Sequence, residues 1–368
     1  MTLTPIISKY MAKNFIFTFA VVLLILFGIT YLFDSIEQLR RVSSKSNADF
    51  WVALEMSALK LPTLAHVLLP FVVLIASLFV FLRLTKSSEL VIIRAAGVSA
   101  WQFIAPLVIV SLLIGILNIT VFNPFASRCF SRFEKLEDTL GLSSSKGVLD
   151  VSSSGLWLKE TKQDTQSTIH AVRIKQEKDY LALWDMSIFE TSLNDEFIRR
   201  IEADEAALQN GEFHLKKVWV MEPNKPAVFM DSMSVVTHLS LDKLEDNFAS
   251  PETMSFWDIP SFIRFFEQTG FSSLRHKLYW YSLVFSPLML VAMVFIASAF
   301  SLKINSRQGS VLLRVVIVLA GGFGLFFFSK LAYALGASAT IPLLLAVLMP
   351  SLIAISLSIF VLLHSEDG

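Results

Sequence analysis

Residues 95–127 read AAGVSAWQFIAPLVIVSLLIGILNITVFNPFAS, and no charged residue occurs between Arg94 and Arg128. A helix needs about 20 predominantly apolar residues to cross a bilayer. This stretch is therefore long enough for a membrane-spanning helix with an entry segment, and a charged region begins directly after it. The stretch predicts a membrane helix that leads into a polar domain.

Five further apolar stretches have the length of a spanning helix. They are residues 14–33, 61–82, 278–302, about 311–335 and about 341–363. The first is too long for a signal-peptide core and is followed by acidic residues instead of a small-residue cleavage site, so we expect it to be retained. The fold class predicted is a membrane α-helical protein with six transmembrane helices, three on either side of an inserted all-β, jelly-roll-like domain.

Charge is distributed unevenly along the 368 residues, of which 54% are hydrophobic and 17% charged. Residues 128–277 hold 18 basic and 24 acidic residues. The rest of the chain holds only 13 basic and 7 acidic residues. We therefore divide the chain into a first transmembrane half (1–127), a polar domain with helical flanks (128–277) and a second transmembrane half (278–368). A net charge of zero argues against a nucleic-acid partner. A single cysteine, Cys129, excludes an intrachain disulfide and a zinc cluster.

Segments of the polar domain alternate between apolar and polar residues with a period of two, which is typical of half-buried strands. The segments are residues 155–159, 168–174, 181–189 and 213–220, with further strands expected near 227–230 and 235–239 and a turn at Asn210-Gly211. About eight short strands indicate an antiparallel sandwich or jelly roll. Helices over 125–140 and 258–268 are expected to connect it to the membrane.

Basic residues in the short loops give the orientation, because cytoplasmic loops carry an excess of Lys and Arg. Eight basic residues fall on the side of the N-terminus and five on the other. Both termini are therefore predicted to be cytoplasmic, and residues 128–277 lie outside.

Motifs of catalysis are missing from the sequence. It has no P-loop and no nucleophile elbow, and its six histidines match no metal-ligand spacing. No catalytic residue and no metal site is therefore predicted. Gly321, Gly322 and Gly324 lie inside an apolar span, where close helix packing is the expected role.

The loop after the second span, about residues 86–97, resembles a short amphipathic helix. Ser87 or Ser88 could cap it, Glu89 would lie near its positive end, and Gly97 could end it. Two interpretations stay open from the pattern alone. The helix is either an interfacial connector or a docking helix that receives force from a cytoplasmic partner.

Charged residues near the outer ends of the spans form a further candidate site. Arg40, Arg41, Arg132 and Lys135 make up a basic collar. The sequence favours membrane anchoring for this collar, with binding of lipid phosphates as the alternative. Lys330 is the only charge between residues 315 and 363, and we hypothesise that it pairs with Asp34 within or between subunits.

The chain resembles the LptF/LptG family of lipopolysaccharide export permeases over nearly its whole length. The resemblance is carried by residues 33–41 (FDSIEQLRR), 88–97 (SELVIIRAAG), 262–270 (FIRFFEQTG) and 286–288 (SPL), together with Tyr10 and Gly155-Leu156-Trp157. It departs from the family at two positions, because relatives carry a basic residue in place of Asp34 and an acid in place of Lys330. That difference suits a swapped charge pair or a differently charged lipid A.

The resemblance implies an inner-membrane complex of a Gram-negative bacterium, with the inserted all-β domain as a periplasmic jelly roll. Its partners would be an LptF-like sister permease, a dimeric LptB-like ATPase that holds ATP and Mg, and an LptC-like periplasmic bridge protein. The chain itself would bind no cofactor. It would extract lipopolysaccharide from the outer leaflet of the inner membrane and pass it to the bridge.

The resemblance also implies roles for individual residues. The ATPase-coupling helix would comprise Ser87, Ser88, Glu89, Leu90, Ile92, Ile93, Arg94 and Gly97. The basic collar would face lipopolysaccharide phosphates, and Phe323, Phe326 and Phe327 on the fifth span would face acyl chains or pack between helices. Asp34 and Lys330 would be a candidate gate pair.

Three alternatives remain. Residues 262–270 and 362–368 favour the LptG branch of the family, but residues 305–309 are shared in character with the LptF branch. A membrane sensor with an extracytoplasmic β domain should carry a cytoplasmic output domain, and only five residues follow Leu363. A membrane enzyme would need a polar cluster within the spans, where we find only His66, Asp34 and Lys330.

Overall fold

The computed structural model contains two compact units. The helical unit comprises Met1–Leu136, Ser255–Trp257 and Leu274–Gly368, and the β unit comprises Glu137–Met254 and Asp258–Ser273. The structure describes all residues except 1–4, 44–49, 88, 90, 91, 93, 94, 96, 141, 143–147, 153, 154, 162–164, 177–179, 193–195, 210, 238–249, 270, 271, 302–310, 367 and 368. The first boundary falls after residue 136, nine residues beyond the predicted one, because the third span continues as a helix.

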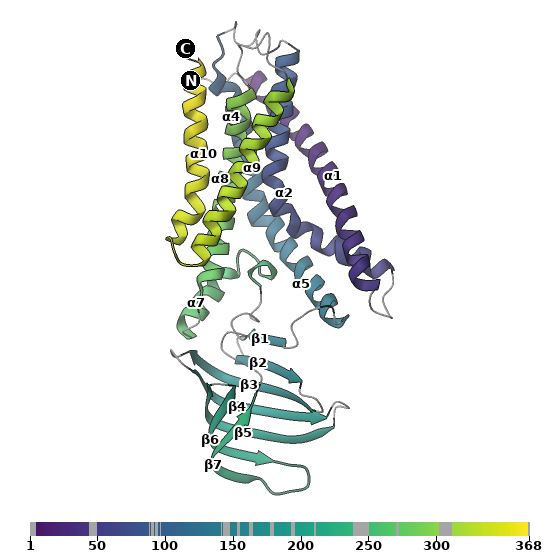
Figure 1. Cartoon of the computed structure of the whole chain (residues 1–368), viewed down its shortest axis with the longest axis vertical. Coiled ribbons are helices and arrows are strands. Elements are labelled where there is room, and N and C mark those ends of the chain that lie inside the picture. The colour runs from purple at the N-terminus through teal and green to yellow at the C-terminus, as the bar shows by residue number, and fades with distance from the viewer. Residues whose placement is uncertain are drawn as a thin grey trace. The chain divides into compact units, whose positions relative to one another are not determined.

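Six segments of the described chain are long and apolar enough to cross a membrane (Figure 1). They are α1 (Pro5–Ser43), α2 (Phe50–Lys86), α4 (Ala100–Leu117) with its continuation, α8 (Leu274–Ser301), α9 (Val311–Ala337) and α10 (Leu343–Glu366). The continuation of α4 is η1 (Asn118–Phe122) followed by α5 (Asn123–Thr139). Each helix covers one of the predicted spans, so the six-span architecture is confirmed. α1 begins and α10 ends at the same end of the helical unit.

Two helices form the centre of the helical unit. In the most apolar stretches of α2 and α8, 67% and 61% of the residues are buried, but only 11% in α1 and 17% in α9. Phe15, Phe81, Phe103 and Leu74 are among the large side chains that are fully buried in the core. The outward faces of α1 and α9 carry many apolar side chains that the described part of the chain leaves uncovered.

Glycines allow the helices to approach closely, as small residues do in membranes. A Cβ at Gly115 of α4 would lie 2.7 Å from the Cα of Pro287 in α8, and one at Gly322 of α9 would overlap the Leu74 side chain. A Cβ at Gly321 would lie 3.1 Å from Ile296 Cγ2. The packing role predicted for Gly321 and Gly322 is confirmed. At Gly324 a Cβ would meet nothing within 4 Å among the described residues, so this glycine does not serve helix packing there.

The described strands of the β unit form one seven-stranded antiparallel sheet in sequence order. The strands are β1 (Val148–Ser152), β2 (Gly155–Thr161), β3 (Thr165–Gln176), β4 (Leu181–Ser192), β5 (Phe197–Gln209), β6 (Glu212–Met221) and β7 (Val228–Val236). The inserted all-β domain is therefore confirmed. Its described connections differ from the predicted jelly roll, because each strand pairs with the next one in a meander. The strand expected near 227–230 and the beginning of the one expected near 235–239 belong to one strand, β7, and residues 238 and 239 lie outside the described residues.

One face of this sheet carries the core of the β unit. Leu158, Ile169, Ile188, Ile201 and Leu215 are each at most 3% exposed. The helix α7 (Ile259–Thr269) packs on the same cluster through Phe266. A short 3-10 helix, η2 (Pro251–Thr253), precedes it. The predicted flanking helices at 125–140 and 258–268 correspond to α5 and α7.

Candidate functional site

The loop after α2 is tied to α1 by a hydrogen bond. Tyr10 Oη in α1 donates to Glu89 Oε2 at 3.0 Å. Glu89, Ile92 and Ala95 are helical, as predicted, and Ile92 is 68% exposed. Gly97 has a φ of +79°, a left-handed conformation that suits glycine at a helix end. Glu89 is therefore connected to α1, and Ile92 offers an apolar side chain to the outside.

The described contacts of Ser87 are with the preceding helix, α2. Its hydroxyl donates to the carbonyl of Arg83 at 3.0 Å, and its backbone N–H donates to the same oxygen at 2.9 Å. The last carbonyls of a helix lack intrahelical donors, so Ser87 satisfies one of them and ends α2. Ser88, the other predicted cap, lies outside the described residues, as do Leu90, Ile93 and Arg94.

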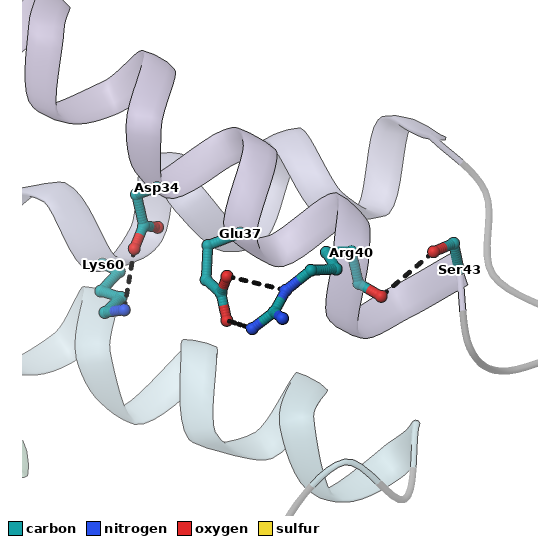
Figure 2. Close-up of polar contacts among 5 residues, drawn as sticks. All are labelled: Asp34, Glu37, Arg40, Ser43 and Lys60. Atoms are coloured by element: carbon teal, nitrogen blue, oxygen red, sulfur yellow. Dashed lines mark hydrogen bonds and ion pairs between the residues drawn. The ribbon is translucent and has the colours of Figure 1, made fainter.

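Asp34 near the far end of α1 pairs with α2 and not with α9. Lys60 Nζ donates to Asp34 Oδ1 at 2.8 Å, and the Asp34 side chain is only 10% exposed (Figure 2). Lys330 lies over the Phe326 ring, with its Nζ 5.6 Å from the ring centroid. The hypothesised pair of Asp34 with Lys330 within one chain is therefore wrong. α1 and α2 are antiparallel neighbours, and this arrangement brings Lys60 to Asp34.

Two arginines of the basic collar are already paired with carboxylates. Arg40 Nε and Nη2 donate to the two oxygens of Glu37 at 3.1 and 2.9 Å (Figure 2). Arg132 Nη2 in α5 donates to Glu55 Oε1 of α2 at 2.8 Å. Arg41 and Lys135 also have interactions within the structure. The collar and its carboxylate partners thus form a belt of charges from α1, α2 and α5.

The paired arginines keep donors for a further ligand. A guanidinium has five N–H donors, and Arg40 and Arg132 are 77% and 68% exposed in their side chains. Exposed ion pairs contribute little to stability, so a phosphate could compete with the carboxylates. The arrangement is therefore compatible with both anchoring and phosphate binding.

An aromatic cluster joins α9 to α2. The ring centroid of Phe71 lies 4.8 Å from that of Phe323 and 4.9 Å from that of Phe326. Phe323 and Phe327 are nevertheless 48% and 68% exposed. Phe326 therefore serves mainly in helix packing, Phe323 combines packing with an open face, and Phe327 projects outward.

Sequence reasoning missed the partners Lys60, Glu55 and Phe71. One signal could have found Lys60. Residues 34 and 60 are equally far along the chain from residue 47, in the segment that joins α1 to α2. In a helical hairpin, residues equidistant from the connection lie at the same height. Acidic and basic residues at such positions are candidates for an ion pair.

The fold and these clusters define a multi-pass membrane protein with a large insertion between its third and fourth spans. The family model of the lipopolysaccharide export system permease LptF/LptG matches residues 9–364. The chain therefore belongs to the LptF/LptG family, and it is a permease of lipopolysaccharide export and a multi-pass protein of the inner membrane. This membership replaces the sensor and membrane-enzyme alternatives.

Two relatives extend over the whole chain. It is 23% identical to the lipopolysaccharide export system permease protein LptG of Haemophilus influenzae, with 98% of this chain and 99% of the relative covered. It is 21% identical to the protein of the same description in Escherichia coli strain K12, with the same coverage. The β insertion and both helical halves are included in these matches.

Proposed function

We propose that this chain is the LptG-type subunit of a lipopolysaccharide exporter. In this proposal it pairs with an LptF-like sister permease and is driven by a dimeric LptB-like ATPase, which binds the ATP and Mg. The full-length similarity to two LptG proteins supports this assignment. The LptF-type subunit is the alternative within the family.

The observation that carries the proposal is the uncovered apolar surface of α1 and α9. Phe17 and Leu24 of α1 and Phe327 of α9 are 69%, 72% and 68% exposed. Within a membrane, lipid or a neighbouring helix must cover such side chains. A sister permease facing these two helices would close a cavity lined by apolar groups, with the basic collar at its outer end.

Such a cavity suits the chemistry of lipopolysaccharide. Removing acyl chains from the bilayer costs about 0.8 kcal/mol per CH₂, and contacts with Phe323 and Phe327 would offset part of this cost. Arg40, Arg41, Arg132 and Lys135 would bind the phosphates through charge-assisted hydrogen bonds. ATP hydrolysis in the partner would supply the remainder.

Coupling would proceed through the loop after α2. The ATPase would push on Glu89 and its exposed neighbour Ile92, and the Tyr10–Glu89 hydrogen bond would carry the displacement to α1. In the proposed orientation this loop and both termini are cytoplasmic. The β unit is periplasmic and passes the lipid to an LptC-like bridge protein.

The test is purification of the chain from native membranes followed by mass spectrometry. We expect an ATPase, an LptF-type permease and bound lipopolysaccharide to accompany it. An accompanying LptG-type permease would instead assign this chain as the LptF-type subunit. Isolation of the chain alone, after crosslinking to prevent dissociation, would contradict the exporter complex.

A further inference from the structure

The third span contains a π-helical turn whose cause is in the sequence. In η1 (Asn118–Phe122) the helix widens, and the N–H of Asn123 donates to the carbonyl of Asn118, five residues earlier. In an α-helix the carbonyl of Thr120 would accept from residue 124, which is proline and has no N–H. Pro124 therefore removes one bond of the ladder and leaves the Thr120 carbonyl open to another donor. π turns of this kind occur frequently at functional sites.

A three-residue segment fills this position. Ser255–Trp257 belongs to the helical unit, although the residues on both sides of it belong to the β unit. The indole Nε1 of Trp257 donates to the Thr120 carbonyl at 3.3 Å. The ring of Phe256 stacks on Trp280 of α8, with centroids 6.0 Å apart and planes 8° apart. We call Ser255–Trp257 the anchor segment, because it holds the chain to the helical unit between two parts of the β unit.

Asn123 is the polar centre of this arrangement and is only 1% exposed. Its Oδ1 accepts from the backbone N–H of Phe256 at 2.8 Å. Its Nδ2 is thereby directed toward Nε2 of His66 in α2, at 3.4 Å. One amide thus connects the start of α5, the anchor segment and α2.

The contact between Asn123 and His66 decides which ring nitrogen of His66 carries the proton. Since Asn123 Nδ2 is a donor, His66 Nε2 accepts, and a neutral imidazole then carries its proton on Nδ1. Asn118 Nδ2 lies 2.9 Å from Nδ1, and Asn118 Oδ1 is buried without a hydrogen-bond partner among the described residues. The amide orientation that satisfies this N–H turns the oxygen of Asn118 toward His66. We call His66, Asn118 and Asn123 the junction cluster.

Placing the junction cluster inside the membrane spans costs free energy, which indicates that the cluster has a function. Polar side chains inside a membrane span are expensive and mark functional positions. Each amide and imidazole here could be an apolar residue if helix packing were the only requirement. Instead, the cluster joins α2 to both the outgoing helix α5 and the anchor segment. A change in the separation of α2 and α4 would therefore pull directly on two connections of the β unit.

We propose that Asn123 is a positioning residue for lipid transfer, through which the junction cluster transmits the movement of the spans to the anchor segment. This inference rests on the proposed function of passing lipopolysaccharide to the β unit. Loss of the Asn123 contacts would leave ATP hydrolysis running while transfer to the β unit fails. A merely structural residue would reduce both together.

The first measurement follows the contact itself in the complete complex with its sister permease and ATPase. Hydrogen exchange at the Phe256 amide should accelerate by about fivefold or more in Asn123→Ala, the change that corresponds to one lost hydrogen bond. Asn123→Asp keeps an acceptor for this amide and should retain its protection. Asn118→Ala removes only a partner of His66 and should leave the exchange rate of the Phe256 amide unchanged. An unchanged exchange rate of the Phe256 amide in Asn123→Ala would contradict the role of Asn123 in holding the anchor segment.

The second measurement is the amount of lipopolysaccharide transferred per ATP hydrolysed in proteoliposomes. A photocrosslinker, p-benzoylphenylalanine, in place of Phe213 on the buried face of the sheet would capture lipid in the β unit. In Asn123→Ala we expect crosslinking per ATP to fall by about fivefold or more, and Asn123→Asp should restore part of it. A wild-type ratio in Asn123→Ala would refute the positioning role.

Two further variants keep the test decisive if Asn123→Ala does not assemble. Trp257→Phe removes only the indole donor to the Thr120 carbonyl, and His66→Phe keeps a ring at the position on α2. Both should lower the transfer ratio, and normal ratios in both would overturn the proposal. If the wild-type complex transfers no lipid to the β unit, the proposed function fails. In that case, hydrogen exchange at the Phe256 amide still tests, independently of lipid transfer, whether Asn123 holds the anchor segment.

Discussion

At the scale of single residues, the hydrogen bond from Tyr10 to Glu89 is the contact that connects the loop after α2 to α1. Tyr10→Phe removes the donor and keeps the ring. A lost hydrogen bond to a charged group costs about 1.5–3 kcal/mol when it is buried and less at a partly exposed site such as this one. We expect the complex to assemble and the transport of lipid per ATP to fall several-fold.

The control for this variant is Tyr31→Phe on the same helix, because no hydrogen bond of Tyr31 is found among the described residues. Transport per ATP should be measured for both variants in the same vesicles. Equal values for Tyr10→Phe and the wild type would show that the loop acts on the spans by another route.

The Asp34–Lys60 pair makes a second prediction for individual residues. Asp34→Asn leaves the ammonium of Lys60 partly buried without its counter-charge, and we expect a loss of about 1–3 kcal/mol of stability. The exchange of both charges, Asp34→Lys with Lys60→Asp, should recover most of it. Thermal unfolding of the purified complex measures both effects. A rescue of Asp34→Lys by Lys330→Asp instead would revive pairing with α9, across subunits.

At the scale of helices and strands, the spacing between α4 and α8 depends on Gly115. A Cβ there would lie 2.7 Å from the Pro287 backbone, which cannot turn aside as a flexible side chain can. Gly115→Ala should therefore separate the two helices and cost about 1–3 kcal/mol. Gly324→Ala is the matched control, because a Cβ at that position meets nothing within 4 Å. Thermal unfolding should show a loss for Gly115→Ala only, and similar curves for both variants would contradict the packing.

The helices and strands differ in how well they can be predicted from the sequence. The helices are predictable because all six apolar stretches have the length of a span and four of them lie between charged residues. β5 is not, because exposed Asp204 and Glu205 are adjacent and shift the alternation between Ala203 and Ala206 by one residue. The opposite strand has Lys217 in a left-handed conformation, with a φ of 51°, at the same irregularity. A strict period-two pattern cannot be found in such a strand.

The candidate sites show the same limit. The sequence indicates that the loop at 86–97 and the collar are unusual, because charges beside apolar spans are conspicuous. It does not provide the partners of these residues, since pairs such as Arg132 with Glu55 depend on how three helices pack. The role of Asn123 is hidden for a similar reason. Its main partner is a backbone N–H from a segment more than 130 residues away.

At the scale of the whole molecule, the basic collar and its carboxylate partners come from three helices, and anchoring and phosphate binding predict different behaviour. Glu37 occupies two donors of Arg40, so a phosphate must compete with it. If Arg40 binds lipopolysaccharide phosphate, Arg40→Ala should weaken binding about fivefold or more, and Glu37→Gln should strengthen it or leave it unchanged. If Arg40 serves only as the partner of Glu37, both variants should behave alike.

The measurement is the affinity of the purified complex for lipopolysaccharide and for its dephosphorylated form. We expect Arg40→Ala to matter only for the phosphorylated form, and its effect to shrink as salt is raised, since exposed charges are screened over about 8 Å at physiological ionic strength. Arg132→Ala and Glu55→Gln repeat the comparison on α5 and α2. Agreement between the two pairs would assign phosphate binding to the collar as a unit. An equal loss for both lipid forms in all four variants would assign these charges to anchoring.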